Sequence, residues 1–360
     1  MTPRERFIRS LTFQPVDRPA RTDMFCLVRE LCGRPFPSEA ELENGAAETR
    51  RGARNDCVAL YERIVRELGH DAIFVWHPFT GPRNLEVIAA LRDRVGDEFG
   101  IIGLACAFWG MERIQDHEAF AERLYEDRAG LLADARRFRD EGIERARALA
   151  RAGADVVYVP NDVAFNTGPY FAPDIFAELV TPFAREFYGE VRRLGVLGVY
   201  HSDGNLMKLL DPILSFGAQA LQSIDPMAGM DIREVKRLTH SKLALIGNVQ
   251  CNLLQEGPEE AIRRSARYCL EHASPGSGYV FMASNSIFEG CPLANYRIMQ
   301  DEYERYVAEN SGSSRIFRHR GHEASSAGHR GDETAPTSKR TTDCTDCTDF
   351  KDETDKYRAL

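Results

Sequence analysis

A short stretch near the middle of the chain brings together side chains that could do chemistry. Residues 199–206 read VYHSDGNL, so His201 and Asp203 follow directly on an apolar run. Positions two apart on an extended segment point the same way, so both side chains can contact one metal ion or one substrate. Imidazole titrates near neutral pH and is the commonest metal ligand. We therefore rank this pair first for catalysis and metal binding. The alternative is an aspartate that fixes the tautomer of a structural histidine.

Polar residues also follow the other apolar runs of the chain. The candidates at these positions are His77, Asn161, Asp162, Asp225, Asn248, Ser284 and Asn285. Each of them alone is as well explained by a turn or a helix cap, because short polar side chains favour both. Their occurrence at several strand ends of one sheet favours a shared site.

The elements that must position these residues are predicted from the hydrophobic pattern. Short apolar runs rich in β-branched residues predict strands, and stretches with apolar spacings of three and four predict helices. The predicted strands are 19–25, 71–76, 99–105, 154–160, 195–201, 220–225, 242–249 and 278–284. The predicted helices are 1–13, 57–69, 131–153, 173–195, 231–238 and 258–273, with Thr2 capping the first and Pro3 in its first turn.

Apolar strands that alternate with helices indicate a parallel sheet that is buried on both faces. Eight such units predict an α/β protein with a (β/α)8 TIM barrel and an N-terminal helix. A doubly wound open sheet is the alternative, but the nucleotide-binding version lacks a GxGxxG or P-loop motif after its first strand. In a barrel of this kind the active site lies at the carboxyl ends of the strands.

Composition limits the class of protein. The 360 residues are 43% hydrophobic and carry a formal net charge of −9, which gives no support to binding of nucleic acid through its phosphates. The sequence contains no apolar run long enough for a membrane span or a signal peptide. Nine cysteines without a disulfide framework predict reduced thiols and a cytoplasmic location.

The C-terminal residues 311–360 differ from the rest in composition. They are rich in Ser, Thr, Gly and Asp and show no sustained hydrophobic period, so we predict a barrel domain over 1–310 and a disordered tail over 311–360. The abrupt change raises the hypothesis that this tail is a non-native extension. Its Cys344 and Cys347 are interpreted as a chance pair rather than half of a metal site.

Several ordered blocks of the sequence resemble the uroporphyrinogen decarboxylase superfamily, which contains the decarboxylase and zinc-dependent methyltransferases that work with corrinoids and thiols. The resemblance covers about residues 1–308. It rests on TPRERFIRSLTFQPVDRP, GADVVYVPNDVAFNTGPYFAPDIFAELVTPFAREFY, VYHSDGNLMKLLDPILSFGAQALQSID, LIGNVQCNLLQEGPEEA and GYVFMASNSIFEGCPLANYRIM. It implies the TIM-barrel fold and a site at the mouth of the barrel.

Two departures argue against the decarboxylase itself. True decarboxylases resemble one another in an RQAGRY-type segment whose arginines bind substrate carboxylates, and the corresponding region here reads RTDMFCLVRELCGRP. They also carry an aspartate at the end of the second strand, where this chain has His77. The resemblance therefore favours the methyltransferase-like branch.

The methyltransferase branch binds zinc through a His-x-Cys at the fifth strand and a Cys at the eighth. His201 matches the first ligand, but Asp203 and Asn285 stand where the two cysteines would be. Zinc accepts a carboxylate, whereas a neutral amide is a poor ligand, so Asp162, Glu289 and Cys291 are the candidates to complete the site. An oxygen-rich ligand set shifts the preference from zinc toward harder divalent metals.

The leading hypothesis is methyl transfer between a small methylated substrate and a corrinoid carried by a partner protein. His201 and Asp203 would hold a metal or polarise the substrate, with Asp162 and His77 as acid–base groups. Substrate-binding residues would be Asn161, Asn166, Tyr170, Asp225, Asn248 and Asn285. The alternatives are decarboxylation of a porphyrinogen and a non-catalytic corrinoid- or tetrapyrrole-binding protein. The family resemblance also allows a homodimer.

Overall fold

The structure is a computed structural model that describes residues 1–78, 81–239 and 242–310. The predicted tail over 311–360, with Cys344 and Cys347, lies outside these residues. The domain boundary near residue 310 therefore stays a prediction. None of the described helices is both long enough and apolar enough to span a membrane.

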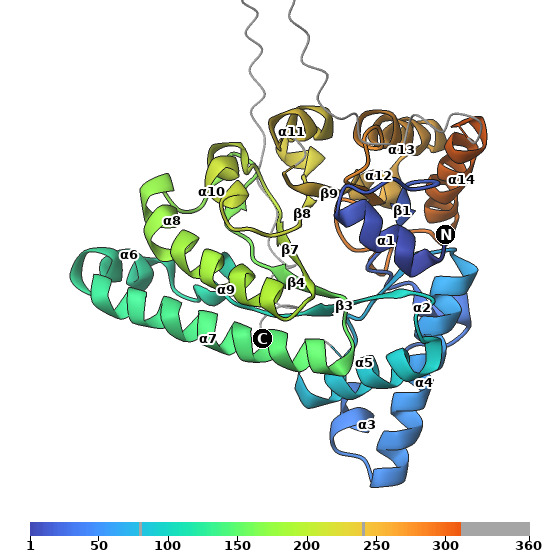
Figure 1. Cartoon of the computed structure of the whole chain (residues 1–360), viewed down its shortest axis with the longest axis horizontal. Coiled ribbons are helices and arrows are strands. Elements are labelled where there is room, and N and C mark those ends of the chain that lie inside the picture. The colour runs from blue at the N-terminus through green and yellow to red at the C-terminus, as the bar shows by residue number, and fades with distance from the viewer. Residues whose placement is uncertain (79–80, 240–241, 311–360) are drawn as a thin grey trace, which may run out of the picture. The chain divides into compact units, whose positions relative to one another are not determined.

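Eight parallel strands form a nearly closed barrel, which confirms the predicted fold (Figure 1). The strands are β1 (Ala20–Arg21), β2 (Ala72–Phe74), β3 (Gly100–Leu104), β4 (Val156–Pro160), β7 (Leu197–Ser202), β8 (Ala220–Ser223), β9 (Ala244–Val249) and β10 (Tyr279–Ala283). Their order in the sheet is β1-β10-β9-β8-β7-β4-β3-β2. Seven of these strands lie within the predicted runs, and β7 extends one residue beyond its run, to Ser202. The carboxyl ends of all eight consequently lie at the same end of the barrel.

Helices surround the strands, as Figure 1 shows. They are α1 (Pro3–Leu11), α2 (Val28–Cys32), α3 (Glu39–Glu43), α4 (Ala47–Glu67), α5 (Gly81–Val95), α6 (His117–Glu126), α7 (Arg128–Ala152), α8 (Pro173–Leu179), α9 (Thr181–Arg193), α10 (Leu210–Leu214), α11 (Ile232–Thr239), α12 (Cys251–Glu256), α13 (Glu259–Ala273) and α14 (Leu293–Asn310). The predicted cap of α1 is confirmed, because the Thr2 hydroxyl accepts a hydrogen bond from the Glu5 amide at 3.2 Å.

One predicted helix, 173–195, is two helices in the structure. Helix α8 ends at Leu179 and α9 begins at Thr181. Pro182 explains the break, because it has no N–H to donate to the preceding turn and its ring clashes with that turn. Proline in the first turn of α9 is well tolerated.

A β-hairpin that the hydrophobic pattern did not predict lies beside the carboxyl end of β7. Its strands are β5 (Ala164–Phe165) and β6 (Gly168–Pro169). The Asn205 amide donates to the Phe165 carbonyl at 2.9 Å. Gly204 has a φ of +83°, and a Cβ there would clash with the Ala164 carbonyl. The residue after Asp203 must therefore be glycine for the hairpin to approach this closely.

Apolar side chains fill the inside of the barrel. Alternate residues of the strands point inward, and Phe7 and Leu11 of α1 join the same buried cluster. Val199 of β7 belongs to this cluster, so His201, two residues further, points into the same space. The inner core thus supports the candidate site from below.

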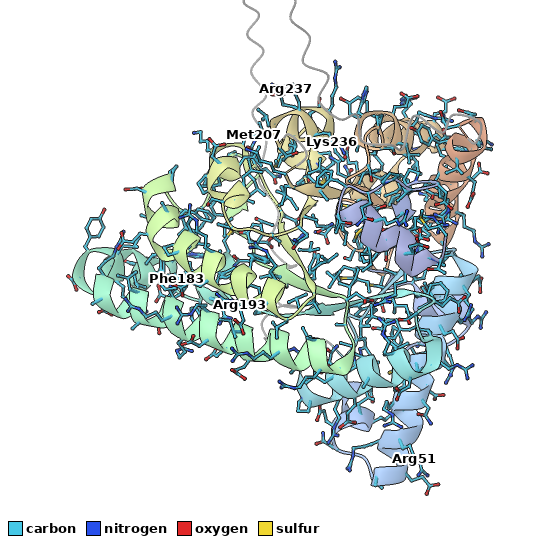
Figure 2. All side chains as sticks on the ribbon, viewed as in Figure 1. Arg51, Phe183, Arg193, Met207, Lys236 and Arg237 are labelled. Carbon is cyan, nitrogen blue, oxygen red and sulfur yellow. The ribbon has the colours of Figure 1, made fainter. Side chains whose placement is uncertain are left out.

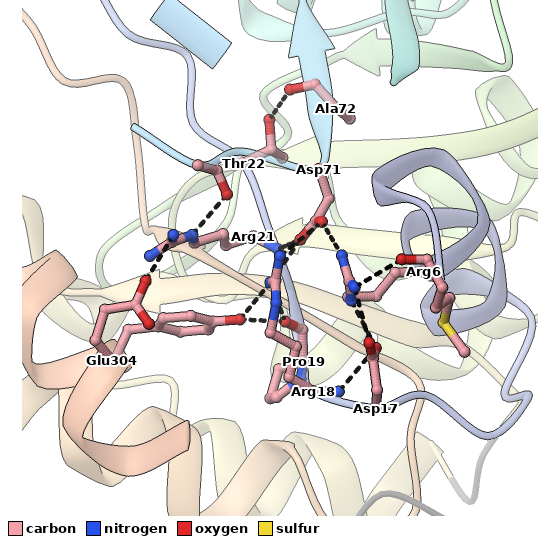
Figure 3. A network of polar contacts seen from close by, with 12 residues as sticks. Arg6, Asp17, Arg18, Pro19, Arg21, Thr22, Asp71, Ala72 and Glu304 are labelled. Atoms are coloured by element: carbon pink, nitrogen blue, oxygen red, sulfur yellow. Dashed lines mark hydrogen bonds and ion pairs between the residues drawn. The ribbon is translucent and has the colours of Figure 1, made fainter. Parts of the chain in front are cut away.

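The seam between β1 and β2 is closed by buried charges instead of a strand ladder (Figure 3). The Asp71 carboxylate is fully buried and accepts hydrogen bonds from Arg6 at 2.6 Å and from Arg18 at 2.9 Å. It also accepts the Arg21 amide at 2.9 Å, while the Asp71 amide donates to the Arg21 carbonyl at 2.7 Å. A single carboxylate therefore joins the two edge strands and the N-terminal segment.

We expect Asp71→Asn to lower the free energy of unfolding by about 3–5 kcal/mol, because Arg18 would keep a largely buried charge without a counter-ion and Arg6 would keep only Asp17. Asp97→Asn is the matched control. Asp97 pairs with Arg4, but its side chain is 85% exposed, so its loss should cost at most about 1 kcal/mol. Urea denaturation measures both. Equal effects would contradict this account of the seam.

Candidate functional site

Three of the predicted residues converge at the mouth of the barrel. Asp162 follows β4, and His201 and Asp203 lie at the end of β7. One ligand atom from each lies within 4.8 Å of the others, which is the arrangement needed to hold a metal ion. His201 Nε2 is 3.5 Å from Asp162 Oδ1 and 4.0 Å from Asp203 Oδ1. Among the described residues this is the one such group of histidine, cysteine and carboxylate side chains.

A hydrogen-bond acceptor on the neighbouring strand sets the tautomer of His201. Its Nδ1 contacts Gln222 Oε1, which also accepts the Tyr158 hydroxyl at 2.6 Å. The Gln222 amide nitrogen donates to the Ser284 carbonyl at 3.1 Å, so the amide cannot be reversed without losing that bond. Nδ1 must therefore carry the proton, and in the neutral ring the Nε2 lone pair faces the two carboxylates. This is the orientation that a metal ligand requires.

Three hydrogen bonds hold Asp203, two through its carboxylate and one through its backbone amide. Its Oδ1 accepts the Ser223 hydroxyl at 2.6 Å, and its Oδ2 accepts the Asn285 amide at 2.5 Å. The Asp203 backbone amide donates to Asp162 Oδ1 at 2.8 Å. Asn285 was a predicted substrate-binding residue, and its side-chain nitrogen is directed at Asp203 instead of at open space. In this position it orients the Asp203 carboxylate.

The electrostatics of Asp203 favour a bound cation. Burial raises the pKa of this carboxyl, and the charges of Asp162 and Asp225 raise it further, while His201 lowers it. The Asp203 and Asp162 side chains nevertheless keep 32% and 45% of their surface exposed. Carboxylates that repel one another and remain accessible are arranged to bind a cation.

No arginine or lysine of the described chain forms an ion pair with the acidic residues of the mouth, which are Glu112, Asp162, Asp203 and Asp225. By contrast, several arginines on the outer helices have side chains that are exposed to solvent. Figure 2 labels Arg51, Arg193 and Arg237, which lie on α4, α9 and α11 with exposed side chains. The mouth therefore carries negative charge that the described arginines and lysines do not neutralise by ion pairs.

The backbone at the end of β8 is strained beside the cluster. Ser223 has a φ of +86° and Ile224 a φ of +49°, and such values are rare for a β-branched residue. Asn248 holds this turn, because its amide donates to the Ile224 carbonyl at 2.6 Å while its oxygen accepts from the Cys269 thiol at 3.2 Å. Strain of this kind is common at functional sites. Asn248, a predicted substrate-binding residue, thus supports this turn through both ends of its side-chain amide.

Asp225 and Asn161 also bind the backbone or neighbouring side chains. Asp225 caps the next turn through the Met227 amide at 2.9 Å and accepts the Gly204 amide at 3.3 Å. Asn161 donates to the Trp109 carbonyl and to Glu112 Oε1, both at 3.1 Å. Both residues lie next to the cluster along the strand ends.

The remaining predicted residues lie apart from the cluster. His77 stacks on Phe36 and its Nε2 contacts the Pro37 carbonyl at 2.7 Å. Burial lowers the His77 pKa, which keeps the ring neutral at physiological pH. Asn166 is exposed at the turn of the β5–β6 hairpin, and the Tyr170 hydroxyl bonds His117 Nδ1 at 2.7 Å. Glu289 and Cys291 do not belong to the group of possible ligands.

Sequence reasoning missed Gln222 and Glu112. Gln222 lies in the middle of an apolar run, where one polar residue gave no signal of a partner on the next strand. Glu112 lies in a 3-10 turn (Met111–Arg113) that follows β3 after several irregular residues, so it was not counted at a strand end. For Gln222 a clue was available. It lies two positions along the strand from an apolar residue, so its side chain is expected to face the inside of the barrel.

The chain is similar to known proteins in sequence and in fold. Residues 52–306 match the uroporphyrinogen decarboxylase (URO-D) family. Among solved structures, the methyltransferase from Methanosarcina mazei is similar, with a TM-score of 0.69 and 19% identity over 85% of this chain and 99% of that one. A D-tagatose 3-epimerase-like protein has a TM-score of 0.40 and 12% identity over 64% of this chain and 85% of that one. No curated protein matches the sequence.

The first structural likeness shows a shared fold, and the family match covers the strands that carry the Asp162–His201–Asp203 cluster. This match spans more than half of the chain. The resemblance seen in the sequence is therefore confirmed, and the protein belongs to the uroporphyrinogen decarboxylase (URO-D) family.

Proposed function

We propose that this protein is a metal-dependent methyltransferase that moves a methyl group between a small methylated substrate and a corrinoid carried by a partner protein. The observation that carries the proposal is the Asp162–His201–Asp203 cluster with its preset histidine. Its fold neighbour, a methyltransferase, supports the reaction class. A cytoplasmic location and a homodimer remain predictions.

The residues present fit a divalent metal. His201 would supply a neutral imidazole nitrogen, and Asp162 and Asp203 would each supply a carboxylate oxygen. One nitrogen and two oxygens suit zinc and also harder metals such as manganese or iron. Gln222 accepts a hydrogen bond from His201, and Ser223 and Asn285 donate hydrogen bonds to Asp203, so the orientation of the ligands is fixed as expected around a metal centre.

In the proposed reaction the metal, when bound, acts as a Lewis acid toward the substrate heteroatom. The protein's own residues hold the geometry. Gln222 keeps the His201 proton on Nδ1, and Ser223 and Asn285 keep Asp203 in place while the substrate binds above the cluster. Asn161, Asn166 and Tyr170 remain proposed substrate contacts at the mouth.

The same charges disfavour decarboxylation of a porphyrinogen. A substrate with several carboxylates needs arginines or lysines at the site, whereas the acidic residues here would repel it. His77 stands where the decarboxylase aspartate would be, and it is bonded to the Pro37 carbonyl. The charge at the mouth therefore favours neutral or cationic substrates.

We expect the purified protein to bind about one divalent ion per chain. His201→Ala and Asp203→Ala should each lose most of this metal, because a cluster of three ligands cannot hold it with two. Asp140→Asn, at an exposed position on α7, is the control and should bind like the wild type. Elemental analysis after dialysis against Mn²⁺ or Zn²⁺ measures the content. Full occupancy in the His201 variant would reject this ligand set.

We expect Gln222→Met to weaken metal binding roughly 10–100-fold, because His201 would lose the acceptor that fixes its tautomer and ring orientation. Methionine has a similar volume, so the fold should persist. Gln255→Met, at an exposed position on α12, controls for the substitution itself. Calorimetric titration with Mn²⁺ measures both affinities. Unchanged affinity in the Gln222 variant would show that the histidine is oriented by other contacts.

The reaction class is tested by incubating the protein with reduced cobalamin and a panel of methyl ethers, amines and thioethers. We expect demethylation of at least one panel member, dependent on the metal and lost in Asp203→Ala. A parallel incubation with uroporphyrinogen should release no carbon dioxide. Carboxyl loss in that sample, without any demethylation, would favour the decarboxylase alternative. Ligand binding without any turnover would favour the binding protein.

A further inference from the structure

Glu112 is a carboxyl group at the barrel mouth that the metal cluster does not use. It lies in the Met111–Arg113 turn beyond β3, and the Met111 amide donates to the Asp162 carbonyl at 2.7 Å. This bond ties the turn to the loop that carries a proposed metal ligand. Glu112 is therefore held beside the cluster without belonging to the group of ligand atoms.

The direction of the Glu112 side chain is fixed by Asn161 and Gly110. The side-chain nitrogen of Asn161 donates hydrogen bonds to Glu112 Oε1 and to the Trp109 carbonyl, each at 3.1 Å. A Cβ at position 110 would clash with the Glu112 carboxylate and with the Asn161 amide. Glycine at this position thus lets the carboxylate fold back toward the strand ends.

The surroundings of Glu112 favour a carboxyl that exchanges protons near neutral pH. The residue is exposed to solvent by surface area, yet the protein atoms around its carboxyl raise the pKa to about 7. The Asp162 charge acts in the same direction, whereas the Asn161 hydrogen bond and Arg113 oppose it. Cys106 and Tyr200 are the other titratable groups that interact with it.

Within residues 1–78, 81–239 and 242–310, no arginine or lysine forms an ion pair with Glu112. The Arg113 guanidinium lies 3.9 Å from the centre of the Phe138 ring on α7, so it is directed away from the mouth. Arg145, the other arginine near this end of β3, donates to the Leu104 and Gly81 carbonyls at 3.1 and 3.0 Å. The carboxyl is thus accessible, oriented and free of an ion pair with either arginine.

We propose that Glu112 is a catalytic residue that donates its proton to the oxygen of a methyl ether as the methyl group leaves. This inference rests on the proposed methyltransferase function. The bond between the methyl carbon and oxygen breaks, its electron pair stays on oxygen, and the Glu112 proton completes the product alcohol or phenol. The methyl group passes to the reduced corrinoid, and Glu112 becomes a carboxylate that later regains a proton from water.

The proposal names a substrate class. An alkoxide or phenoxide is a poor leaving group, so protonation in the transition state accelerates its departure, typically by 10²–10⁴-fold. A sulfonium ion leaves as a neutral sulfide and gains nothing from an acid. Methyl ethers are therefore the donors for which Glu112 matters, and sulfonium ions provide an internal comparison.

The test compares wild type, Glu112→Gln and Glu118→Gln, with metal and reduced cobalamin present. Phenol release from methyl phenyl ether and dimethyl sulfide release from trimethylsulfonium are measured over pH 5.5–8.5, a range set about the pKa of about 7. We expect Glu112→Gln to lose roughly 100-fold on the ether and little on the sulfonium ion. Glu118, exposed on α6, is the matched control and should behave like wild type.

The pH profile provides a second readout. The acid form of Glu112 is present below its pKa, so wild-type ether cleavage should fall as pH rises through about 7. Glu112→Gln should remove this dependence. Equal rates for wild type and variant on the ether would overturn the role of Glu112 and leave methyl transfer standing. Equal losses on both donors would also overturn it, because they indicate a structural role. A wild type that demethylates neither donor would overturn both proposals together.

Discussion

The closure of the barrel depends on the Asp71 carboxylate. Strands β1 and β2 do not form a ladder, and the gap is joined by a carboxylate that binds the arginines of the N-terminal segment. A parallel barrel brings its carboxyl-terminal loops together only if its ends meet. An ion cluster near the N-terminal ends of the strands thus supports the convergence of polar side chains at the opposite end.

The distribution of charge distinguishes the two ends of the barrel. Arginines neutralise the acids in the seam, whereas no arginine of the described residues pairs with the acids at the mouth. Buried carboxylates are stable when a partner is built in, and carboxylates without a partner are arranged for something that arrives from outside. This difference separates a structural cluster from a binding site more clearly than residue type does.

The sequence was sufficient for the architecture and for the centre of the site. The eight strands coincide with the predicted runs, apart from one extra residue at the end of β7, because parallel strands buried on both faces leave a strong apolar signal. The period of two in an extended chain placed His201 and Asp203 together, and the shared strand ends added Asp162. Gln222 and Glu112 were missed, since their roles depend on cross-strand register and on an irregular loop. The direction of the Asn248 side chain, away from the mouth, likewise depends on local backbone geometry that composition does not encode.

The contact between Gln222 and His201 can be recognised from the amino-acid sequence. The two residues are 21 positions apart, and Gly204 must stay free of a side chain because of the hairpin over it. A relative that keeps His-Ser-Asp-Gly together with a glutamine at this separation can build the same oriented imidazole. A relative that keeps the tetrapeptide but has an apolar residue in place of the glutamine retains the histidine and the aspartate. It lacks the hydrogen-bond acceptor that orients the imidazole. This pairing can distinguish chains that are able to orient the imidazole from chains that share only the fold.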